Sequence, residues 1–365
     1  MQKVLFVGSF KSSSKDGSVG GQMFACNTIM NSKLSEEIEW TLIDTTSDSS
    51  IIASLSRRFF KAIKRLFIFC FYIAFKRFDK ILIFTGDGYS FWEKGMMSVL
   101  AKSLTKSKVI LAPRSGIILN DINKNGYLAK FIKFVLRRVD LVLCQSITWK
   151  RYFGALISNV NSDKFIIIEN WIDIKPYKDL PILHRSINEP VTILFLSWLD
   201  TNKGIYELIN ATKMLKKHRS DFKVLIAGMG EAYYGVINEI KNESLQDCIE
   251  LYGWAIGSDK ISVLRRSDIF VLPSYFEGFP NSLMEAMAAG KACIATNVGS
   301  IPDMITNKVN GLIIKQKNAV DLFEKINYLL DNPEFRTQLS HNARKRMKRN
   351  SVEAAILKLK SILID

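Results

Sequence analysis

The segment Asp268-Ile-Phe-Val-Leu-Pro-Ser-Tyr-Phe-Glu-Gly-Phe-Pro-Asn-Ser-Leu-Met-Glu-Ala-Met-Ala-Ala-Gly290 contains a short apolar run, a loop and a helical pattern. The run at 269–272 is typical of a buried parallel strand. Because Gly278-Phe-Pro280 prevents one continuous helix, Glu277 is expected on the loop and Glu285 in the first turn of the helix that follows. Strand, loop and helix in this order predict an open α/β sheet, whose ligands bind at the carboxyl ends of its strands.

The rest of the chain repeats this alternation, which is typical of stacked βαβ units. The expected strands span residues 4–7, 39–43, 81–84, 109–111, 141–144 and 165–168, and then 191–196, 223–227, 249–252, 269–272 and 292–295. Between the two series, residues 170–190 contain three prolines and are interpreted as a linker. We therefore expect an α/β fold of two Rossmann-like, doubly wound domains, 1–180 and 186–349, that face each other across a cleft, with a last helix at 350–365 packing back on the first.

Size and composition exclude several classes of protein. With 365 residues, 48% of them apolar, the chain can build two substantial cores. No apolar stretch reaches the roughly 18 residues that span a bilayer, and Met1–Gly8 resembles a strand rather than a signal peptide, so we expect neither a membrane-spanning nor a secreted protein. The five cysteines are scattered and there are only three histidines, which predicts no metal site and no disulfide framework.

Positive charge is concentrated in the first half of the chain. Residues 1–180 contain 27 Lys and Arg against 15 Asp and Glu, a net charge of +12, while the whole chain carries +16. This excess indicates an anionic partner for the first domain.

The segment from Arg57 to Phe78 combines basic and bulky apolar side chains. The basic residues recur at helical spacing, and the apolar run that follows, residues 66–75, is too short to cross a bilayer. A helix lying in the membrane interface fits both facts, although the apolar half alone fits a helix buried against the sheet equally well. The residues expected to contact an anionic membrane surface are Arg57, Arg58, Lys61, Lys64 and Arg65.

The two glutamates of the opening segment suit a nucleotide bound at the end of the strand. The amino terminus of a helix attracts a diphosphate, and an acidic side chain can accept both hydroxyls of a ribose. Glu285 suits the ribose, and Glu277 suits a sugar beyond the phosphates. Ser282-Leu-Met-Glu285 is also a capping box, in which Glu285 would bond only to the Ser282 N–H group, and the segment alone leaves both interpretations open.

The motif around these glutamates resembles that of family 4 of the retaining glycosyltransferases, which have the GT-B fold. That family carries the pattern E-G-[FP]-[PG]-x-x-x-x-E, and Glu277-Gly-Phe-Pro-Asn-Ser-Leu-Met-Glu285 fits it throughout. The resemblance is strongest from Val191 to Arg346 and is weaker, though collinear, before that. Further matches in the family's order are Gly20-Gly21, Ile168–Asp173, Lys203-Gly204, Gly228-Met-Gly230, Gly299–Pro302 and Asn310-Gly311.

The resemblance implies a metal-independent hexosyltransferase that uses a nucleotide-sugar, expected to be a UDP-sugar, and no further cofactor. Glu277 and Lys203 would be the catalytic residues, the first at hydroxyls of the donor sugar and the second at the diphosphate, while Glu285 would hold the ribose. Together with the basic segment, this favours a lipid-linked saccharide acceptor in the synthesis of surface polysaccharide (O-antigen, capsule or exopolysaccharide). Other residues expected at the donor are Gly20, Gly21, Gly278, Phe279, Pro280, Asn281 and Ser282.

Two positions depart from the family's pattern. Trp198 stands where the family usually has an arginine that binds the donor diphosphate, and tryptophan cannot neutralise a phosphate. Arg114 stands where related enzymes often have a histidine, and it would either pair with an acceptor or donor phosphate or cap a turn at the surface. We count both among the expected substrate-binding residues, and the missing arginine leaves a catalytically impaired homologue as an alternative.

Two other classes of function are less well supported. The basic composition suits a nucleic-acid-binding protein, but the chain has no recognised DNA- or RNA-binding motif. A dinucleotide-dependent oxidoreductase would carry Gly-x-Gly-x-x-Gly, whereas Tyr233 stands at the third glycine position after Gly228-Met-Gly230. We therefore expect a cytoplasmic enzyme, peripheral on the inner face of the membrane. Its expected partners are a nucleotide-sugar donor, a lipid-linked saccharide acceptor and an anionic membrane surface, with no nucleic acid.

Overall fold

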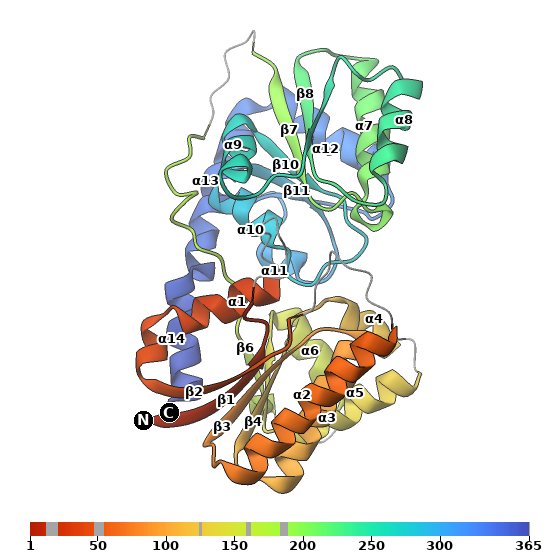
Figure 1. Cartoon of the computed structure of the whole chain (residues 1–365). Coiled ribbons are helices and arrows are strands. Elements are labelled where there is room, and N and C mark those ends of the chain that lie inside the picture. Colours follow the sequence, from red (N-terminus) through yellow and green to blue (C-terminus); the bar gives the residue numbers. More distant parts are fainter. Residues whose placement is uncertain (12–20, 47–54, 124–125, 158–161, 183–188, 365) are drawn as a thin grey trace. The chain divides into compact units, whose positions relative to one another are not determined.

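The computed structural model describes residues 1–11, 21–46, 55–123, 126–157, 162–182 and 189–364 (Figure 1). The chain divides into two compact units: unit 1 comprises Met1–Asn170 and Val352–Asp365, and unit 2 comprises Trp171–Ser351. The division therefore falls before the expected boundary at residue 180. The reason is that Ile172, Tyr177 and Leu180 pack into the core of unit 2.

Unit 1 is built on a six-stranded parallel sheet in the order β2-β1-β3-β4-β5-β6. Every residue of β3 is buried, as expected when helices cover both faces of a parallel sheet. Right-handed crossovers place α2, α3, α5 and α6 on one face and α1 on the other (Figure 1). The strands are β1 (Gln2–Gly8), β2 (Ile38–Asp44), β3 (Lys80–Thr85), β4 (Lys108–Pro113), β5 (Leu141–Cys144) and β6 (Phe165–Ile167). The helices are α1 (Gly21–Met30), α2 (Leu55–Phe75), α3 (Gly88–Leu104), α4 (Ile117–Asn123), α5 (Tyr127–Arg138), α6 (Ile147–Leu156) and α14 (Val352–Leu363).

The last helix of the chain, α14, completes unit 1. The buried Lys80, at the start of β3, donates from Nζ to the backbone carbonyl of Ile362 at 3.0 Å. Gln2 donates from Nε2 to the carbonyl of Ile364 at 3.2 Å. A buried ammonium group needs such partners, so the end of the chain contributes hydrogen bonds that join it to the first sheet.

Unit 2 has a second six-stranded parallel sheet, in the order β12-β11-β10-β7-β8-β9, so the expected α/β class is confirmed for both units. The short strand β12 was not among the expected strands. The strands are β7 (Val191–Leu196), β8 (Phe222–Ala227), β9 (Ile249–Gly253), β10 (Ile269–Leu272), β11 (Ala292–Thr296) and β12 (Leu312–Ile314). The helices are α7 (Ile205–Lys216), α8 (Tyr233–Asn242), α9 (Gly257–Arg266), α10 (Asn281–Ala288), α11 (Ile301–Met304), α12 (Ala319–Asp331) and α13 (Pro333–Met347).

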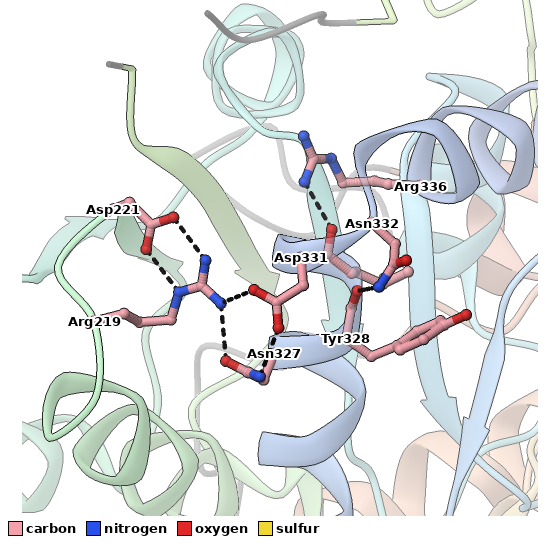
Figure 2. A network of polar contacts seen from close by, with 8 residues as sticks. Arg219, Asp221, Asn327, Tyr328, Asp331, Asn332 and Arg336 are labelled. Atoms are coloured by element: carbon pink, nitrogen blue, oxygen red, sulfur yellow. Dashed lines mark hydrogen bonds and ion pairs between the residues drawn. The ribbon is translucent and has the colours of Figure 1, made fainter. Parts of the chain in front are cut away.

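A polar network closes the amino-terminal edge of the sheet of unit 2 (Figure 2). The guanidinium of Arg219, just after α7, donates to both carboxylate oxygens of Asp221 at 2.6 and 2.7 Å. It also donates to Asn327 at 2.9 Å and to Asp331 at 2.7 Å, both on α12. The backbone of Asp221 in turn accepts the N–H group of Val191 at the start of β7. These bonds join α7, α12 and the starts of β7 and β8 at this edge.

Each sheet has one point where the direction of strand addition reverses. In unit 2 it lies between β7 and β10, because β8 follows on one side and β11 on the other. The helices that follow these two strands, α7 and α10, pack into different cores on the two faces of the sheet, and ligands of open α/β sheets bind at such a point. The corresponding point in unit 1 lies between β1 and β3.

Candidate functional site

The loops after β7 and β10 are fastened together at the reversal point of unit 2. The N–H group of Tyr275 donates to the carbonyl of Asn202 at 2.7 Å. Gly204 has a φ of 71°, and a Cβ atom there would lie only 2.1 Å from the carbonyl oxygen of Pro273. Only glycine allows this conformation and this approach, so the two loops are fixed against each other.

Glu277 and Lys203 form an ion pair across these loops. Nζ of Lys203 lies 2.8 Å from Oε1 of Glu277, and the two side chains are 25% and 9% exposed. The backbone of Glu277 is held by the loop after β11, because Gly299, with a φ of 54°, would place a Cβ atom 1.8 Å from the Glu277 carbonyl oxygen. The structure thus brings together the two expected catalytic residues, Glu277 and Lys203, which are far apart in the sequence.

Helix α10 begins at Asn281, directly after Glu277 and the turn Gly278–Pro280. Its N-cap residue is Pro280, and no side chain caps it. The amino terminus of α10, with Asn281 and Ser282, therefore stands at the same carboxyl edge as the Lys203–Glu277 pair, where a helix dipole attracts anions. The capping box is not formed: Ser282 is not the N-cap residue, and the carboxylate of Glu285 is bound elsewhere.

The carboxylate of Glu285 is held by two side chains that the sequence analysis missed. Nζ of Lys260, on α9, donates to Oε1 of Glu285 at 2.9 Å, and the phenol of Tyr177 lies near the same carboxylate. Burial raises the pKa of Glu285, while Lys260 and Tyr177 act in the opposite direction. Burial and the charge of Glu285 together raise the pKa of Tyr177. No sequence pattern links these positions, which come from α9 and from the expected linker.

Trp198 lies at the start of the loop after β7 and is 57% exposed. Its ring packs on that of Trp254, which follows β9, with centroids 4.4 Å apart and an angle of 47° between the rings. The position that carries an arginine in the resembled family is thus part of an aromatic pair at the carboxyl edge. This pair supplies stacking surface but no charge for a phosphate.

The remaining expected substrate-binding residues lie in unit 1. Gly20 is outside the described residues, and Gly21 is the first residue of α1. Arg114, directly after β4, donates from Nη2 to Oδ1 of Asn170 at 2.5 Å, and its guanidinium lies 5.1 Å from the ring centroid of Phe84. Burial lowers the pKa of Arg114 to about 10. Arg114 is therefore held within the carboxyl edge of the first sheet and is not a freely solvated surface arginine.

The expected membrane-contact residues divide into two groups. Arg57, Arg58, Lys61 and Lys64 are exposed on α2. Arg65 is different, because its guanidinium donates to both carboxylate oxygens of Glu93 on α3, at 2.5 and 2.8 Å, and its side chain is only 20% exposed. Arg65 therefore joins two helices, and its position does not fit the expected membrane contact.

Part of this chain is similar in sequence to known proteins. Residues 183–346 match the sequence model of glycosyl transferases group 1. The N,N'-diacetylbacillosaminyl-diphospho-undecaprenol alpha-1,3-N-acetylgalactosaminyltransferase of Campylobacter jejuni is 35% identical over 46% of this chain and 42% of its own length. The capsular polysaccharide biosynthesis glycosyltransferase CapM of Staphylococcus aureus is 27% identical over 52% of this chain and 48% of its own length. The chain thus matches less than half the length of these two relatives.

A solved structure covers the whole chain. The structure of HepE from Anabaena in complex with UDP-glucose has a TM-score of 0.72 and 16% identity over 100% of this chain and 99% of its own. At this identity the likeness shows the fold alone, which is the two-domain GT-B fold that the sequence predicted.

Proposed function

We propose that this chain, which belongs to the family of glycosyl transferases group 1, moves a sugar from a nucleotide-sugar to a hydroxyl group of a lipid-linked saccharide, with retention of the anomeric configuration. The observation that carries this proposal is the Lys203–Glu277 pair at the reversal point of unit 2, beside the amino terminus of α10. A bound nucleotide-sugar requires a cation beside its diphosphate and, next to it, a side chain that accepts hydrogen bonds from the hydroxyls of the sugar. Lys203 and Glu277 supply these two groups.

Lys203 and the amino terminus of α10 would stabilise the departing diphosphate. During glycosyl transfer positive charge grows on the sugar ring and negative charge on the leaving group. Hydrogen-bond donors that are already in position stabilise that negative charge without any rearrangement of the protein. The ammonium of Lys203 donates to the carboxylate of Glu277. Phosphate oxygens would take over this ammonium and free the carboxylate of Glu277 for hydroxyls of the sugar.

Glu285 would accept the two hydroxyls of the ribose. This function requires an ionised carboxylate, because only then do both oxygens accept hydrogen bonds. Lys260 supports ionisation at a site where burial opposes it. A UDP-sugar is our proposed donor, since HepE, which shares the fold, was solved with UDP-glucose.

A lipid-linked acceptor and a place on the inner face of the membrane are supported by two observations. The Campylobacter relative is named for a diphospho-undecaprenol acceptor, and CapM is named for capsular polysaccharide biosynthesis. The exposed basic residues of α2 suit an anionic membrane surface. Among the described residues, no helix is both long enough and apolar enough to cross a bilayer. We therefore propose peripheral attachment and a role in surface polysaccharide synthesis.

The second candidate is a transferase homologue that binds the donor but turns it over poorly. The specific observation in its favour is Trp198, which brings no positive charge to the place of the family's arginine. The two candidates predict the same donor binding and differ only in release of the nucleoside diphosphate.

Donor binding and turnover can be tested on the purified full-length chain. A panel of UDP- and GDP-sugars should include one UDP-sugar that raises the melting temperature, since a ligand that binds the folded state stabilises it. Glu285→Ala should abolish that rise, whereas Glu324→Ala, which removes an exposed glutamate of α12, should preserve it. Equal shifts in the wild type and Glu285→Ala would contradict the ribose assignment. Release of UDP on addition of lipid-linked saccharides would separate the active from the impaired transferase.

A further inference from the structure

Three helices of unit 1 form one continuous layer on the same face of the sheet: α2, α3 and α5 (Figure 1). Arg65 on α2 binds Glu93 on α3 through two hydrogen bonds. Trp92 on α3 stacks on Phe131 of α5, with centroids 4.2 Å apart and an angle of 11° between the rings. The outer side of this layer is therefore a single surface, which we call the three-helix face.

Large apolar side chains are exposed along the whole three-helix face. On α2, Phe60, Phe67, Phe71 and Phe75 are between 59% and 75% exposed, and their spacing places them in one stripe. The apolar half of α2 is thus buried only on its inner side, through Phe69 and similar residues. The stripe continues on the neighbouring helices with Tyr89, Trp92 and Met96 of α3 and with Tyr127 and Phe134 of α5.

Positive charge accompanies these rings. Helix α2 contains four basic residues besides Arg65, and α5 contains four; neither helix contains an Asp or Glu. The basic groups of α5 lie over its exposed rings, with Nζ of Lys130 6.0 Å from the centroid of Tyr127 and the guanidinium of Arg138 5.0 Å from that of Phe134. Glu93, an acid of α3 within this layer, is neutralised by Arg65.

We propose that α2, α3 and α5 together form the docking surface of this enzyme for an anionic lipid bilayer. The inference rests on the peripheral attachment proposed above and extends it, since α5, which the sequence analysis did not single out, becomes a second basic and aromatic anchor. Aromatic side chains enter the interface between head groups and acyl chains, and basic side chains bind the anionic head groups.

The positive charge of the three-helix face favours an anionic bilayer over the other possible binding partners. Two copies of the chain that met through the same face would bring like charges together, which is destabilising. A nucleic acid would use the basic groups but would leave the phenylalanine stripe of α2 in water. A bilayer with anionic lipid uses both.

The three-helix face reaches the carboxyl edge of the first sheet at one of its ends. Helices α3 and α2 each start on the carboxyl side of the strand before them, so Tyr89 and the basic residues at the start of α2 lie at that edge. Arg114 lies at the same edge, directly after β4. Arg114 is thus at the edge where ligands of such sheets bind.

Sedimentation of the full chain with vesicles tests the role of α5. We expect wild type to bind vesicles of phosphatidylcholine with phosphatidylglycerol far better than vesicles of phosphatidylcholine alone. Tyr127→Ser/Phe134→Ser and Lys130→Gln/Arg138→Gln should each weaken binding about tenfold or more. The matched control Tyr234→Ser/Tyr328→Ser removes exposed aromatic residues of unit 2 and should bind as wild type does.

Several results would overturn the inference. Wild-type binding by both α5 variants would leave α2 as the sole anchor, and equal binding to both kinds of vesicle would remove the need for anionic lipid. A dimer that the α5 variants convert to a monomer, with vesicle binding unchanged, would assign the face to a second copy. The donor-induced rise in melting temperature, measured on the same proteins, is independent of this outcome. If no nucleotide-sugar raised the melting temperature of wild type, this would count against the proposed transferase function. The result on vesicle binding would still hold.

Discussion

Nζ of Lys260 lies 2.9 Å from Oε1 of Glu285, whose side chain is only 11% exposed. Burial alone would favour the neutral carboxylic acid, and the ammonium of Lys260 opposes that effect. Lys260 is therefore a positioning residue: it acts on the donor through the charge of Glu285.

Replacement of Lys260 should make donor binding depend on pH. In Lys260→Met the pKa of Glu285 rises further, so the carboxylate is protonated at lower pH and ionises as the pH increases. We expect the donor-induced rise in melting temperature of Lys260→Met to be smaller than that of wild type at acid pH and to approach it as the pH increases, whereas Lys260→Arg should follow wild type. A loss of binding in Lys260→Met that is equal at every pH would indicate a structural role only.

Lys203 should control turnover more than stability. In Lys203→Met the departing diphosphate loses its cation, and by analogy with the loss of one oxyanion-hole donor we expect kcat to fall about 100- to 1,000-fold. Lys213→Met is the matched control, because Lys213 also forms an ion pair, with Glu243 at 2.6 Å, but lies on α7 outside the site. Rates of UDP release would be compared, and a similar loss in both variants would refute the assignment.

Trp198 offers a gain-of-function test. An arginine at this position would add a charge-assisted hydrogen bond to the diphosphate, so Trp198→Arg should tighten donor binding about tenfold. Calorimetric titration with the donor found in the panel would measure this change. Weaker binding by Trp198→Arg would instead mean that the Trp198–Trp254 pair itself contacts the donor.

The Arg219 network should support the stability of unit 2 without affecting the site. Arg219→Met removes four hydrogen bonds at the amino-terminal edge, some of them to exposed carboxylates, and should lower the melting temperature by about 2–4 °C. The bond from Arg219 lowers the pKa of Asp221, so its stabilisation is present at neutral pH and is lost as the pH falls through the pKa of the folded state. The difference between wild type and variant should therefore shrink in acid. A constant difference would mean that Asp221 contributes little.

Local patterns predicted the strands and the position of the glutamate motif well. Apolar runs such as 269–272 and 191–196 are strands because helices bury both of their faces, and that requirement is visible in the sequence. The three-residue strand β12 was missed, although β6, which has the same length, was predicted. Its place is set by pairing with β11.

Contacts between distant segments could not be predicted. Lys260 and Tyr177 reach Glu285 only because α9 and the segment after Asn170 pack beside α10. Likewise, Arg65 follows the same helical spacing as the other basic residues of α2. Only the position of Glu93 on α3 shows that the Arg65 side chain points away from solvent. A periodic pattern identifies a helix but does not identify the partner on the next helix.

The bond from Lys80 to the carbonyl of Ile362 has a consequence for synthesis of the protein. The ribosome releases the residues of β3 long before those of α14, so the first unit to emerge cannot finish its own packing. Unit 2 is contiguous, so its residues emerge in one uninterrupted run. Unit 1 is thus completed by a segment that is made after the whole of unit 2, so α14 can pack beside β3 only once residues 171–351 have been synthesised.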